Sequence, residues 1–185
     1  YLPFEADITA YVSETPCTMQ VRVQDDSDTS YHTRGKQTLK RGGMFYTAQS
    51  GIWQSVWYEW VPENYVQGCR ITPNYDDASV TIELCSNKTF EDVSLSFEEG
   101  DLSYEVIARE QDGQVITSIT AKFQDGTFQR WSPEEPYLYH FTLQAGLDTI
   151  RSYFAMRSFT IEKDGKSIPR FCLNHKPYFL NGVLD

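Results

Sequence analysis

The chain has 185 residues and a mass of 21.4 kDa, enough for one large or two small domains with a core in each. Hydrophobic residues make up 40% and aromatic residues 15%, which excludes a disordered composition. The net charge of −10 and the mean hydropathy of −0.49 exclude a phosphate-binding surface and a membrane span, so we expect neither nucleic acid nor a membrane as a partner.

The first predicted strand lies in the amino-terminal third. Thr18–Val23 alternates apolar and polar residues, with Met19, Val21 and Val23 on one face. The acidic loop 24–31 follows. Its aspartates alternate as in a calcium loop, but Tyr31 and Gln37 replace the glycine and the glutamate that an EF-hand needs. Backbone capping is the ordinary role of Asp and Ser in such a loop.

The most aromatic stretch reads SGIWQSVW (Ser50–Trp57) and runs on to Trp60. It is rich in tryptophan, tyrosine and β-branched residues and lacks helical spacing, so it predicts a strand. Trp53 and Trp57 fall on the face opposite Val56 and Trp60. We therefore expect a strand shared between two packed layers, or one that joins a sandwich to a neighbour.

A second unit follows, with short alternating segments separated by turn signals. About seven such strands in roughly a hundred residues predict an immunoglobulin-like β-sandwich. The predicted strands are Gly68–Thr72, Ser79–Cys85, Val93–Phe97, Leu102–Arg109, Val115–Phe123, Tyr137–Leu143 and Thr149–Ile161. The predicted turns include Glu98–Asp101, Asp112-Gly113 and Ala145-Gly146. Val80, Ile82 and Leu84 are predicted to face the core.

Two features of the last third bear on chemistry. Trp131–Pro136 breaks the sheet, because proline cannot donate to a ladder. Glu134 and Glu135 within it are adjacent and point apart, so they are not the paired carboxylates of a glycosidase. A hairpin follows, with a turn at Asn174-His175-Lys176. The histidines, His32, His140 and His175, have no neighbouring nucleophile and are interpreted as surface or hydrogen-bonded residues.

The four cysteines are Cys17, Cys69, Cys85 and Cys172, and none has metal-ligand spacing. We predict no metal site. Cys69 and Cys85 flank a hairpin, which leaves two alternatives: a disulfide in an oxidising compartment, or free buried thiols in a cytosolic protein.

Three segments together resemble glycoside hydrolase family 2, which holds the β-galactosidases, β-glucuronidases and β-mannosidases. SGIWQSVW resembles the end of the family's jelly roll, and WSPEEPYLYHFTL (Trp131–Leu143) the end of its immunoglobulin-like domain. RSFTIEKDG through NHKPYFLNG (Arg157–Gly182) resembles the approach to the catalytic barrel. They occur in the family's order and span nearly the whole chain.

The resemblance implies an all-β chain in three parts. Residues 1–64 would be the second half of a sugar-binding-type jelly roll, 65–163 an immunoglobulin-like sandwich, and 164–185 a hairpin that leads into an absent barrel. We expect the first half of the jelly roll to be cleaved or supplied by a neighbour, since half a sandwich leaves edges unpaired.

The resemblance also implies a non-catalytic piece of an enzyme that acts on β-linked sugars, β-galactosidase-like, with both catalytic glutamates on the barrel. No residue of this chain is predicted to be catalytic. Asp28 matches an aspartate that contacts substrate and a monovalent cation. No cofactor is expected in this chain, while the parent enzyme has room for a monovalent or magnesium cation. The expected partners are the sugar substrate and the barrel. A homo-oligomer is compatible with the sequence, as is a bacterial cytoplasmic or periplasmic location.

The alternative is a free-standing carbohydrate-binding or adhesion module of two β-sandwiches, because aromatic faces stack on sugar rings. Trp53, Trp57 and Trp131 discriminate between the two hypotheses: burial favours the hydrolase, and an exposed row favours the binding module. A third hypothesis, a structural spacer, predicts paired cysteines.

Overall fold

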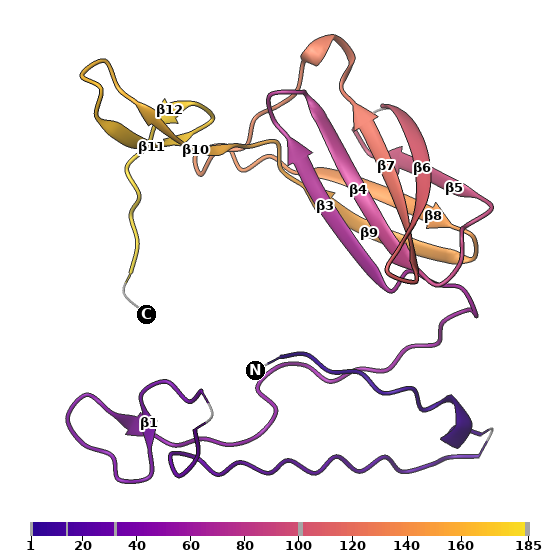
Figure 1. Ribbon diagram of the computed structural model, residues 1–185, viewed down its shortest axis with the longest axis vertical. Helices are drawn as coiled ribbons and strands as arrows, with labels where there is room; N and C mark the ends of the chain where they lie inside the picture. The colour runs from indigo at the N-terminus through magenta and orange to yellow at the C-terminus, as the bar shows by residue number, and fades with distance from the viewer. Residues whose placement is uncertain (1, 14, 32, 100–101, 184–185) are drawn as a thin grey trace. The chain divides into compact units, whose positions relative to one another are not determined.

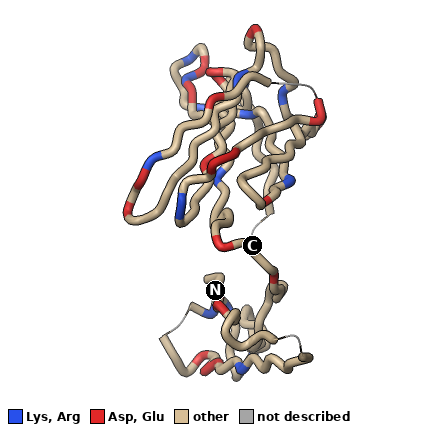
Figure 2. Tube along the Cα trace, turned by 90° about the vertical axis from the view of Figure 1, so that its right-hand side faces the viewer, with Lys and Arg blue, Asp and Glu red and all other residues tan. Residues whose placement is uncertain are grey.

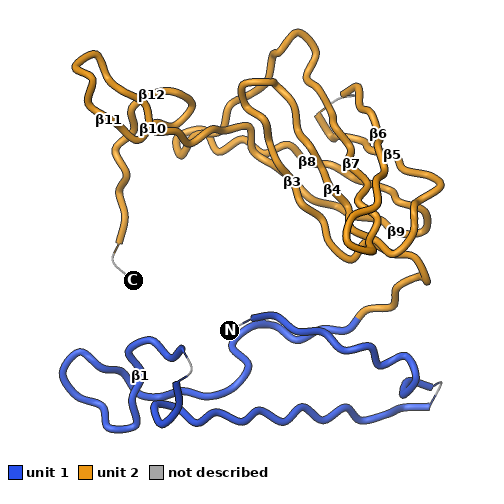
Figure 3. The backbone as a smooth tube through the Cα atoms, viewed as in Figure 1, with its two compact units in different colours: residues 1–58 blue, residues 59–185 orange. Residues whose placement is uncertain are grey.

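The computed structural model describes residues 2–13, 15–31, 33–99 and 102–183. They divide into two compact units, residues 1–58 and 59–185 (Figure 3). Within these ranges the regular structure is β-strand plus two short 3-10 turns, η1 (Thr9–Tyr11) and η2 (Gln124–Gly126). No helix in the described ranges is long and apolar enough to cross a membrane. The expected all-β fold is confirmed, while the predicted boundaries after residues 64 and 163 stay predictions.

Residues 1–58 contain little regular structure. The described part holds β1 (Gln37–Thr38) and β2 (Tyr46–Thr47), which pair in parallel, and none of its described residues is buried. The strands predicted at 18–23 and 50–60 were wrong, because neither segment joins a ladder. Alternation of apolar side chains gives a segment one buried face only where a second layer covers it.

The second unit contains a β-sandwich of two antiparallel sheets (Figure 1). The four-stranded sheet has the order β3-β4-β7-β6, and the three-stranded sheet the order β5-β8-β9. Their bounds are β3 Gly68–Asn74, β4 Ser79–Ser86, β5 Val93–Phe97, β6 Ser103–Gln111, β7 Gln114–Lys122, β8 Tyr139–Ala145 and β9 Asp148–Phe154. This is the strand order of a constant-type immunoglobulin sandwich.

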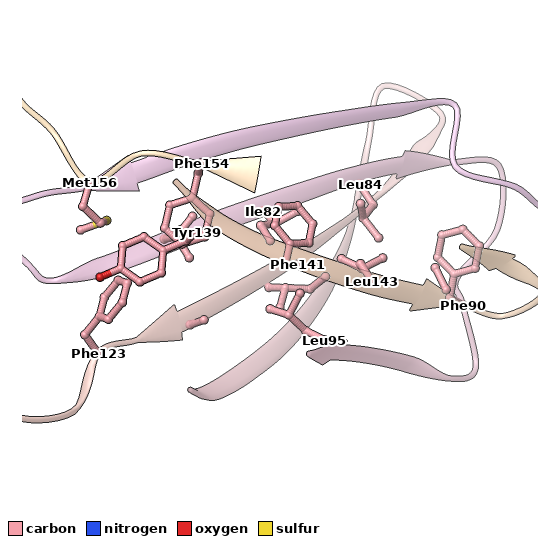
Figure 4. Close-up of a cluster of buried hydrophobic side chains, with 14 residues drawn as sticks. Ile82, Leu84, Phe90, Leu95, Phe123, Tyr139, Phe141, Leu143, Phe154 and Met156 are labelled. Carbon is pink, nitrogen blue, oxygen red and sulfur yellow. The ribbon is translucent and has the colours of Figure 1, made fainter. Parts of the chain in front are cut away.

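The core lies between these two sheets (Figure 4). Val80, Ile82 and Leu84 of β4 are fully buried, as their alternation predicted, and Phe141 and Leu143 of β8 come from the other sheet. Aromatic rings fill one end, where the rings of Tyr139 and Phe154 stack with centroids 5.3 Å apart. The hydroxyl of Tyr139 accepts a hydrogen bond of 2.6 Å from the backbone N–H of Gln129, so the buried ring keeps a partner for its polar atom.

The single strand predicted over Thr149–Ile161 was wrong. The segment forms β9 and β10 (Phe159–Lys163), which belong to different sheets. Between them Met156 is buried, and its carbonyl accepts a hydrogen bond of 3.0 Å from the N–H of Trp131. The backbone there therefore pairs with a loop, and the ladder ends.

A third, smaller sheet contains β10, β11 (Pro169–Leu173) and β12 (Lys176–Pro177), all antiparallel. The predicted hairpin is present, with its turn at Asn174-His175. The turns predicted at Asp112-Gly113 and Ala145-Gly146 are present as well, with positive φ at Asp112, Gly113 and Gly146. Half of the turn predicted at Glu98–Asp101, residues 100 and 101, lies outside the described residues.

The cysteines are free thiols. Cys85 pairs with Gly68 across the β3–β4 ladder, and Cys69 pairs with Leu84. Side chains alternate along a strand, so Cys69 and Cys85 point to opposite faces of the sheet. Partial burial raises the pKa of the Cys69 thiol. Of the two alternatives, the structure has free thiols, but the expected burial was wrong, because Cys69 is exposed and Cys85 is only partly buried.

Candidate interface on the third sheet

The third sheet presents an apolar surface. Ile161 of β10 pairs with Phe171 of β11, so both point to one face, and they are 68% and 61% exposed. A shallow groove of about 230 Å³ runs along the sheet, and most of its lining is apolar: Phe159, Ile161, Phe171, Leu173, Tyr178 and Leu180. A cluster of exposed, large aromatic and aliphatic side chains indicates an interaction surface.

The turn of the hairpin is tied to the sandwich by Asn174. Its side-chain oxygen accepts a hydrogen bond of 3.0 Å from the N–H of Ser158, and its amide donates one of 3.0 Å to the carbonyl of Trp131. The backbone N–H of Asn174 also donates to the carbonyl of Ser158 at 2.9 Å. One side chain thus joins three separate segments.

His175 occupies the second position of the same turn, with φ of 63° where a two-residue hairpin turn favours glycine. Its Nδ1 lies 2.6 Å from a carboxylate oxygen of Glu162, and its Nε2 lies 2.6 Å from one of Asp76 in the β3–β4 turn. An ionised carboxylate only accepts hydrogen bonds. Both ring nitrogens must therefore donate, which requires the imidazolium form.

The charges of this cluster shift its pKa values in opposite directions. The pKa of His175 lies above its ordinary value of 6.5, chiefly because of its hydrogen bond to Glu162 and then that to Asp76. The pKa of Glu162 lies below its ordinary value of 4.5, chiefly because Thr160 donates to it and also because His175 does. The predicted role of His175 as a hydrogen-bonded histidine is confirmed.

The two glutamates at the sheet break have separate partners. The hydroxyl of Tyr178 lies 3.4 Å from Glu134 Oε1, and the backbone N–H of Glu135 donates to Ser132 Oγ at 3.1 Å. The pKa of Glu134 is lowered by hydrogen bonding to backbone N–H and to Ser132. Glu134 therefore contacts the hairpin rather than forming a pair with Glu135.

Asp28, the predicted substrate-binding residue, lies in the loop of the first unit. Its Oδ2 accepts a hydrogen bond of 3.1 Å from the N–H of Leu39, and its carbonyl accepts one of 2.7 Å from Arg34 Nη1. These contacts close the loop locally. The substrate role of Asp28 stays a prediction, and His32 lies outside the described residues.

One trio in the described residues has the donor set for a cation. Ligand atoms of Glu98, Glu99 and His140, three residues on the surface, lie within 4.8 Å of one another. His140 Nδ1 is 3.6 Å from Glu99 Oε1, which also accepts the backbone N–H of His140 at 3.3 Å. Sequence spacing did not reveal this trio, because β8 brings His140 beside the end of β5 from far along the chain.

Charge is dispersed elsewhere. Acidic and basic residues are interspersed along both units (Figure 2). The sequence did not single out the apolar third sheet, although the alternation of Phe159 and Ile161 was a signal for it. The joint roles of Asp76, Glu162 and His175 had no local signal, because these residues are far apart in the chain.

The fold and this surface define the chain as a β-sandwich protein that carries an additional small sheet with an apolar face. The model of the family described as glycosyl hydrolases family 2 matches residues 64–157, just over half of the chain and the whole sandwich. The chain belongs to this family.

Proposed function

We propose that this chain is a non-catalytic part of a family 2 enzyme that cleaves β-linked sugars, β-galactosidase-like in specificity. In this proposal the sandwich and the third sheet support the catalytic barrel, and the loops of residues 1–58 form part of its rim. The observation that carries the proposal is the family match over 64–157, followed directly by a sheet with an exposed apolar face.

The third sheet supports a docking role. Phe171 and Ile161 stand in the open, and burying a side chain of this size contributes roughly 1.5–3 kcal/mol. Two hydrogen bonds tie the turn to segments outside the third sheet, from Asn174 to the carbonyl of Trp131 at 3.0 Å and from His175 to Asp76 at 2.6 Å. A partner seated on this face would therefore be held in a fixed relation to the sandwich.

The contacts of the carboxylates support a non-catalytic role. Retaining cleavage needs two carboxyl groups about 5–5.5 Å apart on either side of the sugar. Here Glu162 is bonded to His175, Glu134 to Tyr178, and Asp28 to the backbone of its own loop. Each of these groups has a structural partner, which favours a supporting or binding role for them rather than retaining catalysis.

A comparison of nitrophenyl glycosides tests this division of labour. We expect the 185-residue chain to show no turnover, and a protein extended through the barrel to cleave the β-galactoside faster than the β-glucuronide or the β-mannoside. Turnover by the 185 residues alone would refute the non-catalytic role. A preference for another glycoside would refute only the galactosidase assignment.

Substitutions on the third sheet test its docking role in the extended enzyme. We expect Ile161→Ser and Phe171→Ser to lower its thermal stability, because each exchanges a buried apolar side chain for a hydroxyl. Leu147→Ser is the matched control, since Leu147 is also exposed but lies in the β8–β9 turn. Equal effects of all three changes would argue against a barrel on this face.

Asp28→Asn tests the proposed substrate and cation contact. The amide keeps an oxygen that can accept from the Leu39 N–H, so the loop is retained while the charge is lost. In the extended enzyme we expect a higher KM and a weaker dependence on monovalent cations. Asp26→Asn, two residues away in the same loop, should leave both unchanged.

A second candidate, a carbohydrate-binding module, is favoured by the tryptophans. Trp53 and Trp57 are 72% and 74% exposed, which is the outcome that the binding hypothesis predicted, while Trp131 is half-buried beneath Arg157. If they bind sugar, β-linked oligosaccharides should quench the tryptophan fluorescence of the isolated chain, and Trp57→Ala should weaken that binding. Unchanged fluorescence would argue against the binding module and leave the supporting role as the remaining proposal.

A further inference from the structure

β6 is the outermost strand of the four-stranded sheet. It pairs with β7 on one side through nine consecutive residue pairs, and its other side has no neighbour in the described chain. All nine residues from Ser103 to Gln111 are exposed. An open edge of this length presents a row of unpaired N–H and C=O groups, which is a template for another strand.

The other edges of the sandwich are better protected against such pairing. β3 contains Pro73, which cannot donate to a ladder, β5 has only five residues, and β9, with seven, is shorter than β6. β6 has neither a proline nor a lysine, and its ladder with β7 continues without a bulge. Among the described edges, β6 is therefore the most suitable for a partner strand.

The side chains of β6 are complementary to those of a second, antiparallel copy of the same strand. Ile107 stands at the centre and is 61% exposed, with Glu105 and Arg109 two residues away on either side. Residues two apart share a face of the strand. If two copies of β6 pair antiparallel with Ile107 opposite Ile107, each Glu105 lies opposite the Arg109 of the other copy.

The opposite face fits the same register. There Val106 of one copy lies opposite Ala108 of the other, which places apolar side chains together. A two-fold axis through Ile107 repeats each pair, as an isologous interface requires. Arg109 Nη2 lies 3.0 Å from Glu83 Oε1 on β4, across the intervening strand β7, so its exposed side chain would turn toward the open edge to meet Glu105 of the other copy.

We propose that β6 is the contact surface for a second copy of this chain. The two strands pair antiparallel about Ile107, and the four-stranded sheets of the two copies join into one continuous sheet. The two Glu105–Arg109 pairs fix the register, and the backbone hydrogen bonds of the open edge supply the ladder.

Charge reversal tests the register. Sedimentation equilibrium of the 185-residue chain should show a dimer of twice 21.4 kDa that dissociates on dilution. Glu105→Arg and Arg109→Glu each place like charges opposite one another twice, and each should raise the dissociation constant at least about tenfold. The double variant restores opposite charges and should recover dimerisation.

Two controls separate this interface from other effects. Glu110→Arg changes the charge of the same strand, but lies opposite Tyr104 in this register and should leave the dimer intact. Far-UV circular dichroism should show that every variant is folded. A monomer at all concentrations, a dimer that survives Glu105→Arg, or a double variant that stays monomeric would each overturn the proposal.

Discussion

The two units of this chain use aromatic side chains in opposite ways. In residues 59–185, Phe141, Tyr139 and Phe154 pack between two sheets, and Phe141 is 2% exposed. In residues 1–58, Trp53 and Trp57 are more than two-thirds exposed. Both regions alternate large apolar residues with polar ones. The difference shows that alternation produces a buried face only where a second hydrogen-bonded layer is present to cover it.

The largest expected difference between the two units is in hydrogen exchange. Amides in β4 and β7 lie inside a continuous ladder over a buried core, so they should exchange only through global unfolding. Residues 18–23 belong to no ladder. We expect exchange at least about 1,000 times slower in β4 and β7, measured by mass spectrometry of peptides. Similar rates in both segments would contradict the comparison.

Alanine substitutions should show the same difference between the two units in the free energy of unfolding. Phe141→Ala leaves a cavity in the core and should lower the free energy of unfolding by about 3–5 kcal/mol. Trp57→Ala removes an exposed ring and should change it by less than about 0.5 kcal/mol. Urea unfolding followed by circular dichroism measures both. A large loss for Trp57→Ala would show that the first unit has a core of its own.

A smaller effect is expected at the turns that shape the sandwich. Gly113 has φ of +79° between β6 and β7, a conformation that costs an L-residue about 1–2 kcal/mol. Gly113→Ala should therefore destabilise the second unit by roughly that amount. Gly165→Ala is the control, because Gly165 has open space and no positive φ; its effect should stay within about 0.5 kcal/mol.

The smallest effect is expected at His175, whose cluster is open to solvent. Because the pKa of His175 is raised in the folded state, its contribution to stability is complete below pH 6.5 and is lost as the pH rises through the folded pKa. Because the pKa of Glu162 is lowered, its contribution is complete above pH 4.5 and is lost on further acidification. Stability from the cluster should be greatest between these values.

Nuclear magnetic resonance of the His175 ring checks this prediction directly. The ring should titrate above pH 6.5 in the native chain. Glu162→Gln, which removes the larger cause of the shift, should lower that pKa more than Asp76→Asn does. A ring that titrates at its ordinary value would show that the two hydrogen bonds do not persist in solution.

The sandwich could be predicted from the sequence because its signals are local. Alternation at Val80, Ile82 and Leu84 indicated a strand and its inner face, and Asp112-Gly113 indicated a turn. The break between β9 and β10 could not be predicted, since it depends on the carbonyl of Met156 pairing with Trp131. The expected strand through Trp53 and Trp57 failed for the same reason: ladder partners come from distant residues.

The candidate surface was less predictable than the fold. The sequence placed a hairpin at the right position, but the contacts of His175 to Asp76 and Glu162 join three separated segments and leave no spacing pattern. The role of Asp28 was inferred from resemblance alone. Its contact with the Leu39 N–H gives it a local structural function that the sequence had suggested for such loops in general.

The two hydrogen bonds of the Asn174 side chain have a consequence for protein engineering. Its side chain links Ser158, which directly precedes β10, to the carbonyl of Trp131, so the small sheet cannot rotate relative to the 131 segment without breaking the bond to Trp131. A chimera that exchanges the hairpin between relatives therefore has to carry the 131 and 158 segments with it as one cassette. A graft cut at residue 164 would separate Asn174 from its matched partners at Ser158 and Trp131, and the transplanted hairpin would be less firmly held.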